Sequence, residues 1–454
     1  MARHVRQFCY LAALLMFSTH DTLASDPSAV LPLKSVAYGI SFNVDISLGG
    51  QSYPVIVDTG SADLWVMGSD WTCYYGGETT EGTQVPRSEC FTGNKTYTES
   101  STFTPISNAW IGEHYGAGNV IGTLGFEDAQ LGAITIPQQE MGVINASTMY
   151  NDGYCSGLMG LGYPDIAQIH PSDYSATNSL ELLEHRLLYP TVLTRMAGLG
   201  VEYFSMALER TPLNQESGFG KSTTSDKLPM LTWPAGGYLG FAALPSVAHG
   251  PFVTAPVEIT KTIPTSFTND TRKITFWTTT VEAAFWADAT YEEPFQVVVD
   301  SGNWQNILPE AAANKINAAF DPPAVPHLSA SLGNETYYKV DCDATPPAGF
   351  GIQIAGKTFQ IDPADMIWRD DSGTCYSSIS PGIPEQRISL MFLGDAFLKN
   401  VVAVFDYGKD EMRFAQRISN ASYTGQAVTG AASTSASPRL GLAPVMIAGV
   451  LALL

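Results

Sequence analysis

Two segments of the chain share one design, in which a run of β-branched apolar residues leads into an aspartate, a hydroxyl residue and a glycine. One runs from Pro54 to Ser61 and contains Asp58; the other runs from Phe295 to Asn303 and contains Asp300. A buried strand would hold each carboxylate rigidly, while the hydroxyl could bond across to its twin and the glycine would allow close backbone approach. The repeat predicts two loops of like structure, whose carboxyl groups come together if the loops meet.

Carboxyl groups brought together in this way can share one proton. Like charges about 3 Å apart do not both ionise easily, so one pKa falls and the other rises. The ionised member can then take a proton from a water molecule while the protonated member polarises a carbonyl. The sequence holds no His-Glu-x-x-His zinc motif, and its 7 histidines are scattered. We therefore expect neither a metal nor a cofactor.

Two other segments carry weaker versions of catalytic patterns. Asp371-Ser372-Gly373 repeats the triplet, but Arg369 and Asp370 precede it where an apolar strand belongs, which favours a turn. Residues 153–157 resemble a nucleophile elbow around Cys155, a motif that requires a following helix. The glycine-rich run that follows is strand-like instead. We therefore interpret Cys155 as a buried apolar residue.

Composition indicates a globular, mostly β protein. The 454 residues are 45% hydrophobic and 15% charged, enough for two domains, and the formal charge of −21 disfavours nucleic-acid partners. Short alternating runs broken by turn residues predict strands, such as Ser41–Leu48 before Gly49-Gly50 and a hairpin over Leu131–Ile136. Convincing helices are few, the clearest at Asn178–Leu188.

Both ends carry targeting signals. Basic residues, an apolar stretch from Phe8 to Phe17 and a small-residue cleavage site predict a signal peptide over 1–24, followed by a short leader, 25–37. A polar spacer at 419–439 and an apolar tail at 440–454 predict a GPI-attachment signal with Gly430 as the attachment site. The alternatives for this end are a short tail anchor or a disordered segment.

Export agrees with the sequons and the cysteines. Several of the Asn-x-Ser/Thr sequons should carry surface glycans; they are Asn94, Asn145, Asn269, Asn334 and Asn420. After signal removal five cysteines remain. In an oxidising compartment we expect the pairs Cys73–Cys90 and Cys342–Cys375, with Cys155 left over.

The surroundings of the aspartates carry a family resemblance. Asp58–Val66 resembles the N-lobe signature of pepsin-like aspartic proteases, Glu113–Asn119 resembles their flap, and Ser156–Gly162 resembles the segment that threads behind the first aspartate loop. Ile307-Leu308-Pro309 and Phe392–Leu398 follow as in the C-lobe, and Cys342 and Cys375 sit where the family has its C-lobe disulfide. These elements keep the family's order from Tyr38 to Gln416. With the terminal signals, the layout is most similar to fungal GPI-anchored, yapsin-like members.

The resemblance implies a bilobal, mostly β fold with an active-site cleft between an N-lobe, 38–210, and a C-lobe, 211–418. It implies an aspartic endopeptidase that acts on proteins or peptides as a monomer, secreted or held at the cell surface, with Asp58 and Asp300 as catalytic residues. It assigns Thr59, Gly60, Ser61, Ser301, Gly302 and Asn303 to support of the two loops. It assigns Tyr115, Gly116, Ala117 and Gly118 to the flap, with Trp65 as hydrogen-bond partner of Tyr115.

Three departures from the family pattern leave an alternative open. Asn303-Trp304 replaces a small hydroxyl pair; Asn303 can still donate to Asp300, and Trp304 either reshapes the cleft floor or packs into the C-lobe. Ala117 replaces a polar flap residue, and the leader is shorter than the family's basic pro-segment. The alternative is a catalytically impaired pepsin-fold protein that binds a partner at the cell surface.

Overall fold

The computed structural model describes residues 27–36, 39–76, 82–172, 186–210, 232–263, 268, 270, 272–329, 335–369, 373–382 and 390–418. The predicted signal peptide, the spacer and the anchor tail with Gly430 lie outside these residues. So do three sequons (Asn269, Asn334 and Asn420), Asp371-Ser372 and residues 178–185 of the predicted helix. Residues 186–188, where that helix was expected to end, form a loop.

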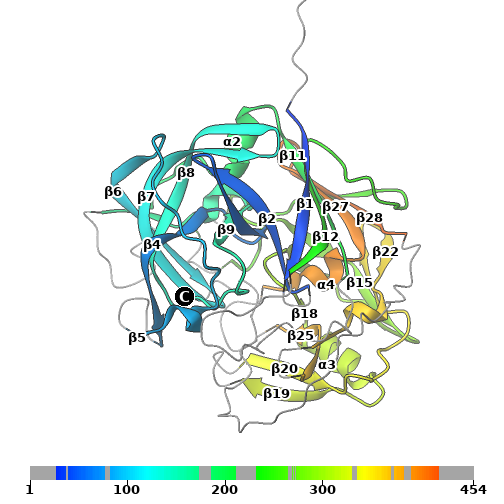
Figure 1. The fold of residues 1–454 in the computed structure, drawn as a ribbon. Helices are drawn as coiled ribbons and strands as arrows, with labels where there is room; N and C mark the ends of the chain where they lie inside the picture. Colours follow the sequence, from blue (N-terminus) through cyan, green and yellow to red (C-terminus); the bar gives the residue numbers. More distant parts are fainter. Residues whose placement is uncertain are drawn as a thin grey trace, which may run out of the picture.

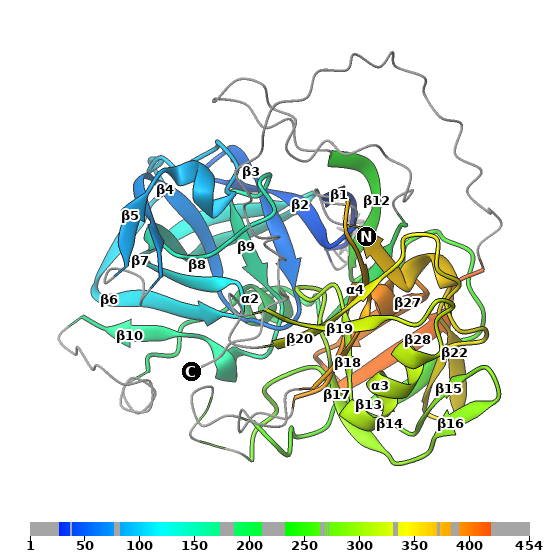
Figure 2. The same ribbon diagram turned by 90° about the horizontal axis from the view of Figure 1, so that it is seen from below.

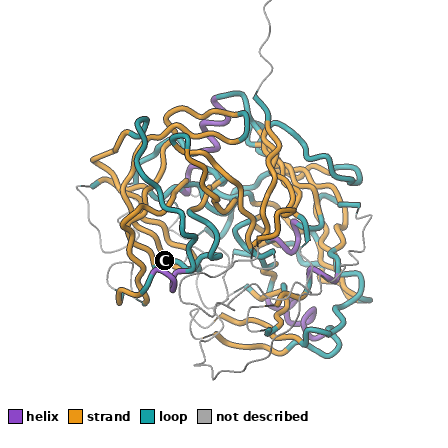
Figure 3. The backbone as a smooth tube through the Cα atoms, viewed as in Figure 1, coloured by secondary structure: helices purple, strands orange, loops and turns teal. Residues whose placement is uncertain are grey.

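Strands dominate the described chain, as the alternating pattern predicts (Figure 3). Those of the first half are β1 (Ala29–Val36), β2 (Ser41–Leu48), β3 (Gln51–Asp58), β4 (Leu64–Tyr75), β5 (Thr83–Val85), β6 (Thr104–Tyr115), β7 (Gly118–Leu131), β8 (Ile134–Ser147), β9 (Gly157–Gly160), β10 (Ile169–Pro171) and β11 (Tyr203–Leu208). Helical turns are η1 (Arg87–Cys90) and η2 (Pro164–Ile166), with one short helix, α2 (Val192–Gly198).

The second half continues with shorter strands. They are β12 (Thr232–Phe241), β13 (Val253–Pro256), β14 (Thr278–Val281), β15 (Ala283–Trp286), β16 (Ala289–Tyr291), β17 (Phe295–Val299), β18 (Asn306–Leu308), β19 (Val325–Ser329), β20 (Glu335–Val340), β21 (Gly351–Ile354), β22 (Lys357–Gln360), β23 (Ile367–Arg369), β24 (Cys375–Ser377), β25 (Ile379–Pro381), β26 (Phe392–Leu393), β27 (Val401–Asp406) and β28 (Glu411–Gln416). The helical elements are α3 (Glu310–Ala318), η4 (Pro363–Asp365) and α4 (Asp395–Leu398). Among the helices of the described chain, none has the length and apolar composition needed to cross a bilayer.

One 15-stranded sheet runs through both halves of the molecule. Its order is β10-β6-β7-β8-β4-β9-β3-β2-β1-β12-β11-β27-β28-β13, with β5 attached to β4. The N-lobe strands and the yellow-to-orange C-lobe elements gather on opposite sides, as Figures 1 and 2 show from two directions. A five-stranded sheet, β14-β17-β26-β18-β25, and two four-stranded sheets complete the C-lobe. The fold is therefore mostly β and two-lobed, with hydrogen bonding continuous across the middle.

Two hairpins match the sequence prediction. β2 and β3 pair antiparallel from Asn43–Ile56 to Leu48–Gln51, and Gly49 and Gly50 turn the chain with φ of +56° and +80°. A side chain at Gly49 would also collide with Ser100, because an added Cβ would lie 2.3 Å from the Ser100 Cβ. Glycine is therefore required at Gly49 by both conformation and space. β7 and β8 form the second hairpin, closing at Leu131–Ile134.

Most of the segment that the sequence suggested as a short leader is part of the sheet. Residues 29–36 form β1, which pairs with β12 along most of its length and with β2 at its C-terminal end. Leu33 and Val36 are fully buried in the hydrophobic cores. β11, which precedes the expected lobe boundary at 210, pairs with β12 and β27. The central sheet thus takes strands from both sides of that boundary.

Side-chain contacts add to the connection between the lobes. The indole N–H of Trp277 donates to the Leu161 carbonyl at 2.8 Å, and the Tyr163 hydroxyl donates to Asp410 at 2.9 Å. Tyr163 and Trp277 pack with ring centroids 4.8 Å apart. A salt bridge joins Lys273 to Asp165 at 2.6 Å, although its partly exposed position limits its contribution.

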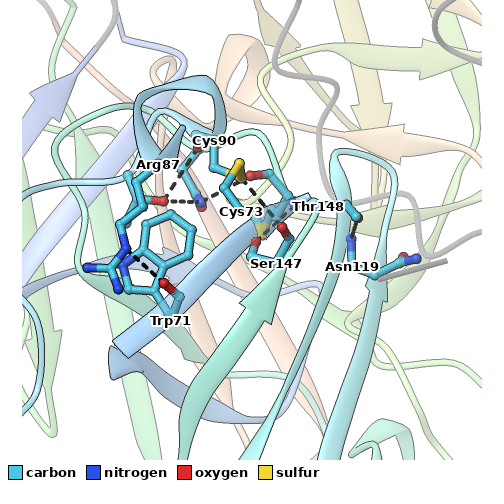
Figure 4. Close-up of a disulfide and its surroundings, with 10 residues drawn as sticks. Trp71, Cys73, Arg87, Cys90, Asn119, Ser147 and Thr148 are labelled. Carbon is cyan, nitrogen blue, oxygen red and sulfur yellow. Dashed lines mark hydrogen bonds between the residues drawn. A yellow bond between two sulfur atoms is a disulfide. The ribbon is translucent and has the colours of Figure 1, made fainter. Parts of the chain in front are cut away.

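Both predicted disulfides are present, Cys73–Cys90 and Cys342–Cys375. Figure 4 shows the surroundings of the first: Arg87 donates to the Trp71 carbonyl at 2.7 Å and covers the Trp71 ring. At the end of β8, next to this disulfide, the Thr148 hydroxyl accepts the backbone N–H of Asn119 at 2.9 Å. The disulfide therefore supports the end of β8 on which the start of β7 rests.

Removing the Cys73–Cys90 bond should lower the free energy of unfolding by about 3 kcal/mol. The bond closes a loop of 17 residues, and its loss frees the unfolded chain more than the folded one. Urea unfolding of the Cys73→Ser/Cys90→Ser double variant would measure the loss. Cys155→Ala, which removes the buried thiol but no crosslink, is the control. A double variant within about 1 kcal/mol of wild type would contradict the expectation.

Candidate active site

The two aspartate loops meet at the centre of the molecule, each built by the same strand arrangement. β3 ends at Asp58 and lies parallel to β9, while β17 ends just before Asp300 and lies parallel to β26. The Leu161 N–H donates to the Asp58 carbonyl at 2.7 Å, and the Asp300 N–H donates to the Leu393 carbonyl at 3.0 Å. The threading segment around β9 and the Phe392–Leu398 segment thus occupy matching positions behind the two loops.

A glycine in each threading segment makes this close approach possible. A Cβ on Gly160 would lie 2.4 Å from the Ala62 carbonyl carbon, and one on Gly394 would lie 2.1 Å from the Asn303 carbonyl oxygen. Such separations exclude any side chain. Each loop is therefore fixed by backbone packing on a neighbouring strand.

The hydroxyl residues that follow the aspartates brace the loops against each other. The Thr59 hydroxyl donates to the Val299 carbonyl, and the Ser301 hydroxyl donates to the Val57 carbonyl, both at 2.8 Å. Each hydroxyl also accepts the backbone N–H of the other residue, at 2.9 Å for Thr59 and 3.2 Å for Ser301. This four-bond exchange is buried and reciprocal. It realises the cross-loop bond that the residue types suggested.

The carboxyl groups of Asp58 and Asp300 are fully buried and lie within hydrogen-bonding reach of each other. Asp58 accepts the Gly60 N–H at 2.7 Å through Oδ1 and the Ser61 hydroxyl at 2.5 Å through Oδ2. Asp300 accepts the Gly302 N–H at 2.8 Å through Oδ1, and its Oδ2 has no hydrogen-bond donor among the described residues. The two aspartates therefore differ in the number of donors that stabilise their charge.

Burial and mutual contact set the proton affinity of the pair. Burial raises the pKa of Asp58, and the Ser61 and Gly60 donors oppose the rise. Burial raises the pKa of Asp300 well above its usual range, and the nearby Asp58 charge raises it further. Asp300 is accordingly the member that keeps a proton when Asp58 is ionised.

Asn303 does not make the bond expected of it. Its side-chain oxygen accepts the Gln305 N–H at 3.0 Å, so the amide is tied to its own loop, and its Nδ2 has no acceptor among the described residues. Trp304 is buried at 3% exposure and packs on Trp368 with ring centroids 4.9 Å apart. Trp304 thus packs in a cluster that joins aromatic residues of the C-lobe to Val36 and Ile40 from the N-terminal part of the chain.

The segment that the sequence indicates as a flap forms a hairpin. β6 and β7 pair antiparallel up to Tyr115–Gly118, with Gly116-Ala117 at the turn and Gly118 at φ +125°. The Trp65 indole N–H donates to the Tyr115 hydroxyl oxygen at 2.8 Å, as predicted. The Tyr150 N–H donates to the Ala117 carbonyl at 2.8 Å. A hairpin with a buried tyrosine is thereby anchored to the strand that follows Asp58.

Two buried carboxyls near these loops escaped the sequence prediction. Asp395 is fully buried at the start of α4, and neither carboxyl oxygen has a hydrogen-bond donor in the described chain. Burial raises the pKa of Asp395 well above its usual range, opposed by the Lys399 ammonium. Glu113 lies on the flap strand and is 4% exposed. Both stood inside recognised motifs, but nothing in the one-dimensional pattern marked them as buried acids.

The other predicted positions in the described chain are two glycosylation sequons and the unpaired cysteine. Asn94 and Asn145 are exposed, as glycan acceptors must be. Cys155 is fully buried and unpaired, and burial raises the pKa of its thiol well above the usual range, so the thiolate needed for nucleophilic chemistry is disfavoured. The cysteine-nucleophile alternative therefore has no support from the geometry.

Comparisons with known proteins agree with this geometry. The model of the family described as eukaryotic aspartyl protease matches residues 41–218 and 257–417. A probable aspartic-type endopeptidase of Aspergillus fumigatus is 34% identical over 394 residues, covering 84% of this chain and 80% of that protein. Vacuolar protease A of the same organism is 25% identical over 383 residues, 82% of this chain and 78% of its own length.

A solved structure agrees at the level of the fold. The crystal structure of an aspartic proteinase from Irpex lacteus has a TM-score of 0.60 and 18% identity, and the match covers 86% of this chain and 98% of that one. With the family model matching well over half of the chain, the assignment is plain. The chain is an aspartic-type endopeptidase that belongs to the eukaryotic aspartyl protease family.

Proposed function

We propose that this endopeptidase hydrolyses peptide bonds with a water molecule activated by Asp58 and Asp300, and that it works in acid at the cell surface. The observation that carries the mechanism is the unequal hydrogen bonding of the two contacting carboxyls. Asp58 has two donors among Gly60 and Ser61, whereas Asp300 has one, from Gly302. The carboxyl with more donors is stabilised in its ionised form, and its neighbour keeps the proton. The same division of roles is known for aspartic proteases in general.

In this division of roles Asp58 is the base and Asp300 the acid. The ionised Asp58 takes a proton from the water as it attacks the peptide carbonyl, and the proton on Asp300 moves toward the carbonyl oxygen. Because the Tyr115 oxygen accepts from Trp65, its own O–H remains available to donate toward a bound peptide. Burial holds the pKa of Tyr115 well above its usual range, so it remains a neutral donor.

The binding-only alternative is less well supported. A protein that only binds has no chemical need for two buried carboxyls in contact, which cost free energy to desolvate. Trp304 packs in a buried cluster with Trp368, and the reciprocal Thr59–Ser301 brace is intact. Catalytic impairment through Trp304 therefore lacks a structural basis.

The proposed location rests on the terminal signals of the sequence. The signal peptide at 1–24 and the tail at 440–454 suit a secreted, GPI-anchored monomer of the yapsin-like kind. Two disulfides suit an oxidising compartment, and the exposed Asn94 and Asn145 suit glycosylation. Treating cells with a phosphatidylinositol-specific phospholipase should release the protein; retention on the cells would exclude the anchor.

The pH dependence of peptide cleavage tests the mechanism. Activity should peak in acid and fall as pH rises, because the active pair holds one proton and loses it on Asp300, whose pKa lies above the usual carboxyl range. The statine-type inhibitor pepstatin should abolish cleavage of a denatured protein at pH 3 to 6. A kcat/KM flat through neutrality, or cleavage that persists with inhibitor, would contradict the shared-proton mechanism.

A further inference from the structure

Three carboxyl side chains of the N-lobe are buried behind the first catalytic loop and have no part in the chemistry above. Asp63 lies between the Asp58 loop and β4, Glu113 lies on the flap strand β6, and Glu140 lies on β8. Their exposed fractions are 1%, 4% and 1%. Buried acids are costly unless they are paired or neutral, so this group calls for a physical account.

The Glu113 and Asp63 side chains lie within hydrogen-bonding reach of each other. Glu113 Oε1 and Asp63 Oδ1 are both buried and receive no N–H or O–H from any other described residue. Asp63 Oδ2 already accepts the Gln168 N–H at 2.7 Å. Two ionised carboxylates cannot bond to each other, so a bond between these two side chains requires one proton. Burial raises the pKa of Glu113 well above its usual range, which places that proton on Glu113.

The charges around Glu113 favour its protonated form. Burial raises the pKa of Glu113 well above its usual range, and the negative charges of Asp63 and Asp58 raise it further. Arg186 opposes the rise, but it also donates to the Asp165 carbonyl at 2.6 Å. On the Arg186 side, Asp165 carries its own salt bridge to Lys273.

Glu140, the third buried acid, lies close enough to Asp63 to feel its charge. Burial and the Asp63 charge raise the pKa of Glu140 well above its usual range, and Arg195 on α2 opposes the rise. On β6, His114 alternates with Glu113 and Tyr115 and bonds to Asn119 at 3.1 Å, so it faces away from the acids. Among the described residues, net negative charge thus surrounds Glu113.

We propose that Glu113 is a positioning residue for the flap: its protonated contact with Asp63 ties β6 to the segment that follows Asp58 and so holds Tyr115 in place. Glu113 and Tyr115 lie two residues apart on one face of β6, and both are buried. Asp63 is followed directly by β4, whose Trp65 bonds to Tyr115. The protonated Glu113–Asp63 contact is therefore a second connection between β6 and the start of β4, beside the Trp65–Tyr115 hydrogen bond.

The Glu113–Asp63 contact should break as pH rises and Glu113 loses its proton. Ionised Glu113 would place a second negative charge beside Asp63 in a dry site, where repulsion is strong. The folded-state pKa of Glu113 is raised above that of the unfolded or opened state, so the closed form binds more protons. Its stability is then greatest below about pH 4.5 and is lost as pH rises through the folded-state pKa. The flap should therefore loosen with rising pH through the loss of a proton that is separate from the one shared by the catalytic pair.

Glu113→Gln tests the proposal, because glutamine donates an N–H to Asp63 at every pH. Amide hydrogen exchange, corrected for intrinsic rates, would be followed from pH 4 to 7 in peptides covering 112–120. In wild type the opening constant should rise about tenfold per pH unit over the range where one proton is released. In Glu113→Gln the pH dependence of the opening constant should correspond to one proton fewer than in wild type. KM should stay constant up to a higher pH than in wild type.

Glu127→Gln is the matched control. Glu127 is also a buried glutamate on the neighbouring strand β7, but it accepts hydroxyl bonds from Tyr97 and Ser100, at 2.5 and 2.7 Å. Burial would raise its pKa, yet these bonds and one from Thr102 outweigh burial and lower it. Relative to wild type, Glu127→Gln should therefore lose stability as pH rises, whereas Glu113→Gln should gain it. Glu127→Gln should keep the wild-type pH slope of flap exchange.

The inference rests on the proposed roles of the Asp58 loop and the flap, but hydrogen exchange does not require an active enzyme. Equal pH slopes in wild type and Glu113→Gln would overturn the role of Glu113 even if cleavage follows the proposed mechanism. A lower pH slope of flap exchange in Glu113→Gln, together with no cleavage by wild type or any variant, would support the Glu113–Asp63 link and refute the catalytic proposal. Glu113→Leu, which removes the bond entirely, should exchange faster than wild type at pH 4; slower exchange there would also overturn it.

Discussion

Asp300→Asn should lower kcat/KM by about 10³- to 10⁴-fold, the scale at which a positioned acid–base group contributes. Asparagine keeps the size of the side chain but cannot give a proton to the carbonyl oxygen. Because the pKa of Asp300 is raised in the folded enzyme, its ionisation costs stability as pH rises. The variant should therefore be at least as stable as wild type at pH 6, so a loss of activity would not reflect unfolding.

The chain supplies a matched control for that substitution. Asp371 stands in a third Asp-Ser-Gly triplet that lacks the preceding apolar strand, so Asp371→Asn should keep wild-type activity. Asp58→Asn should resemble Asp300→Asn, since the two groups act as a unit. Cleavage of a fluorogenic peptide at pH 4 measures all three. An Asp300→Asn enzyme within tenfold of wild type would refute the catalytic pair.

Trp304→Ala should lower the free energy of unfolding by about 3–5 kcal/mol, the usual cost of emptying a buried tryptophan site. Trp304 packs on Trp368, and its cluster includes Val36 at the end of β1 and Ile40 just before β2. Trp304→Phe is the informative companion. The indole N–H has no acceptor among the described residues, so phenylalanine removes an unsatisfied donor and should cost under about 1 kcal/mol.

The same pair of variants tests the impaired-enzyme alternative. If Trp304 only packs, Trp304→Phe should cleave peptide within a few-fold of wild type. Urea unfolding at pH 5 and kcat/KM at pH 4 are the measurements. A Trp304→Phe or Trp304→Ser enzyme at least tenfold more active than wild type would show that the native tryptophan obstructs catalysis.

Local patterns predicted the parts of the site that depend on local chemistry. The apolar strands before Asp58 and Asp300 and both disulfides follow from residue type and order, whereas the flap with Tyr115 was expected from the family resemblance. The same reasoning identified the turn at Gly49-Gly50. In each case the requirement, such as positive φ or a buried strand before a carboxyl, is written in a few adjacent residues.

The errors came where distant contacts decide the outcome. Asn303 looked like a donor to Asp300, but its Oδ1 accepts the Gln305 N–H and its Nδ2 has no acceptor among the described residues. The helix at 310–318 went unnoticed, although Pro309 and Glu310 at its start are typical of helix beginnings. Glu113 resembled an ordinary polar strand residue, because its burial against Asp63 depends on a segment fifty residues earlier.

The pairing of β1 with β12 has a consequence for synthesis of the chain. About 200 residues separate these two strands, so β1 leaves the ribosome long before most of its hydrogen-bonding partners exist. At 5–20 residues per second the delay is about 10–40 s. During this time residues 29–36 offer an open strand edge, a ready site for aggregation or chaperone capture. Yield in a secreting host should thus respond to elongation rate and chaperone supply, and a circular permutant that places residues 29–36 beside β12 should relieve that dependence.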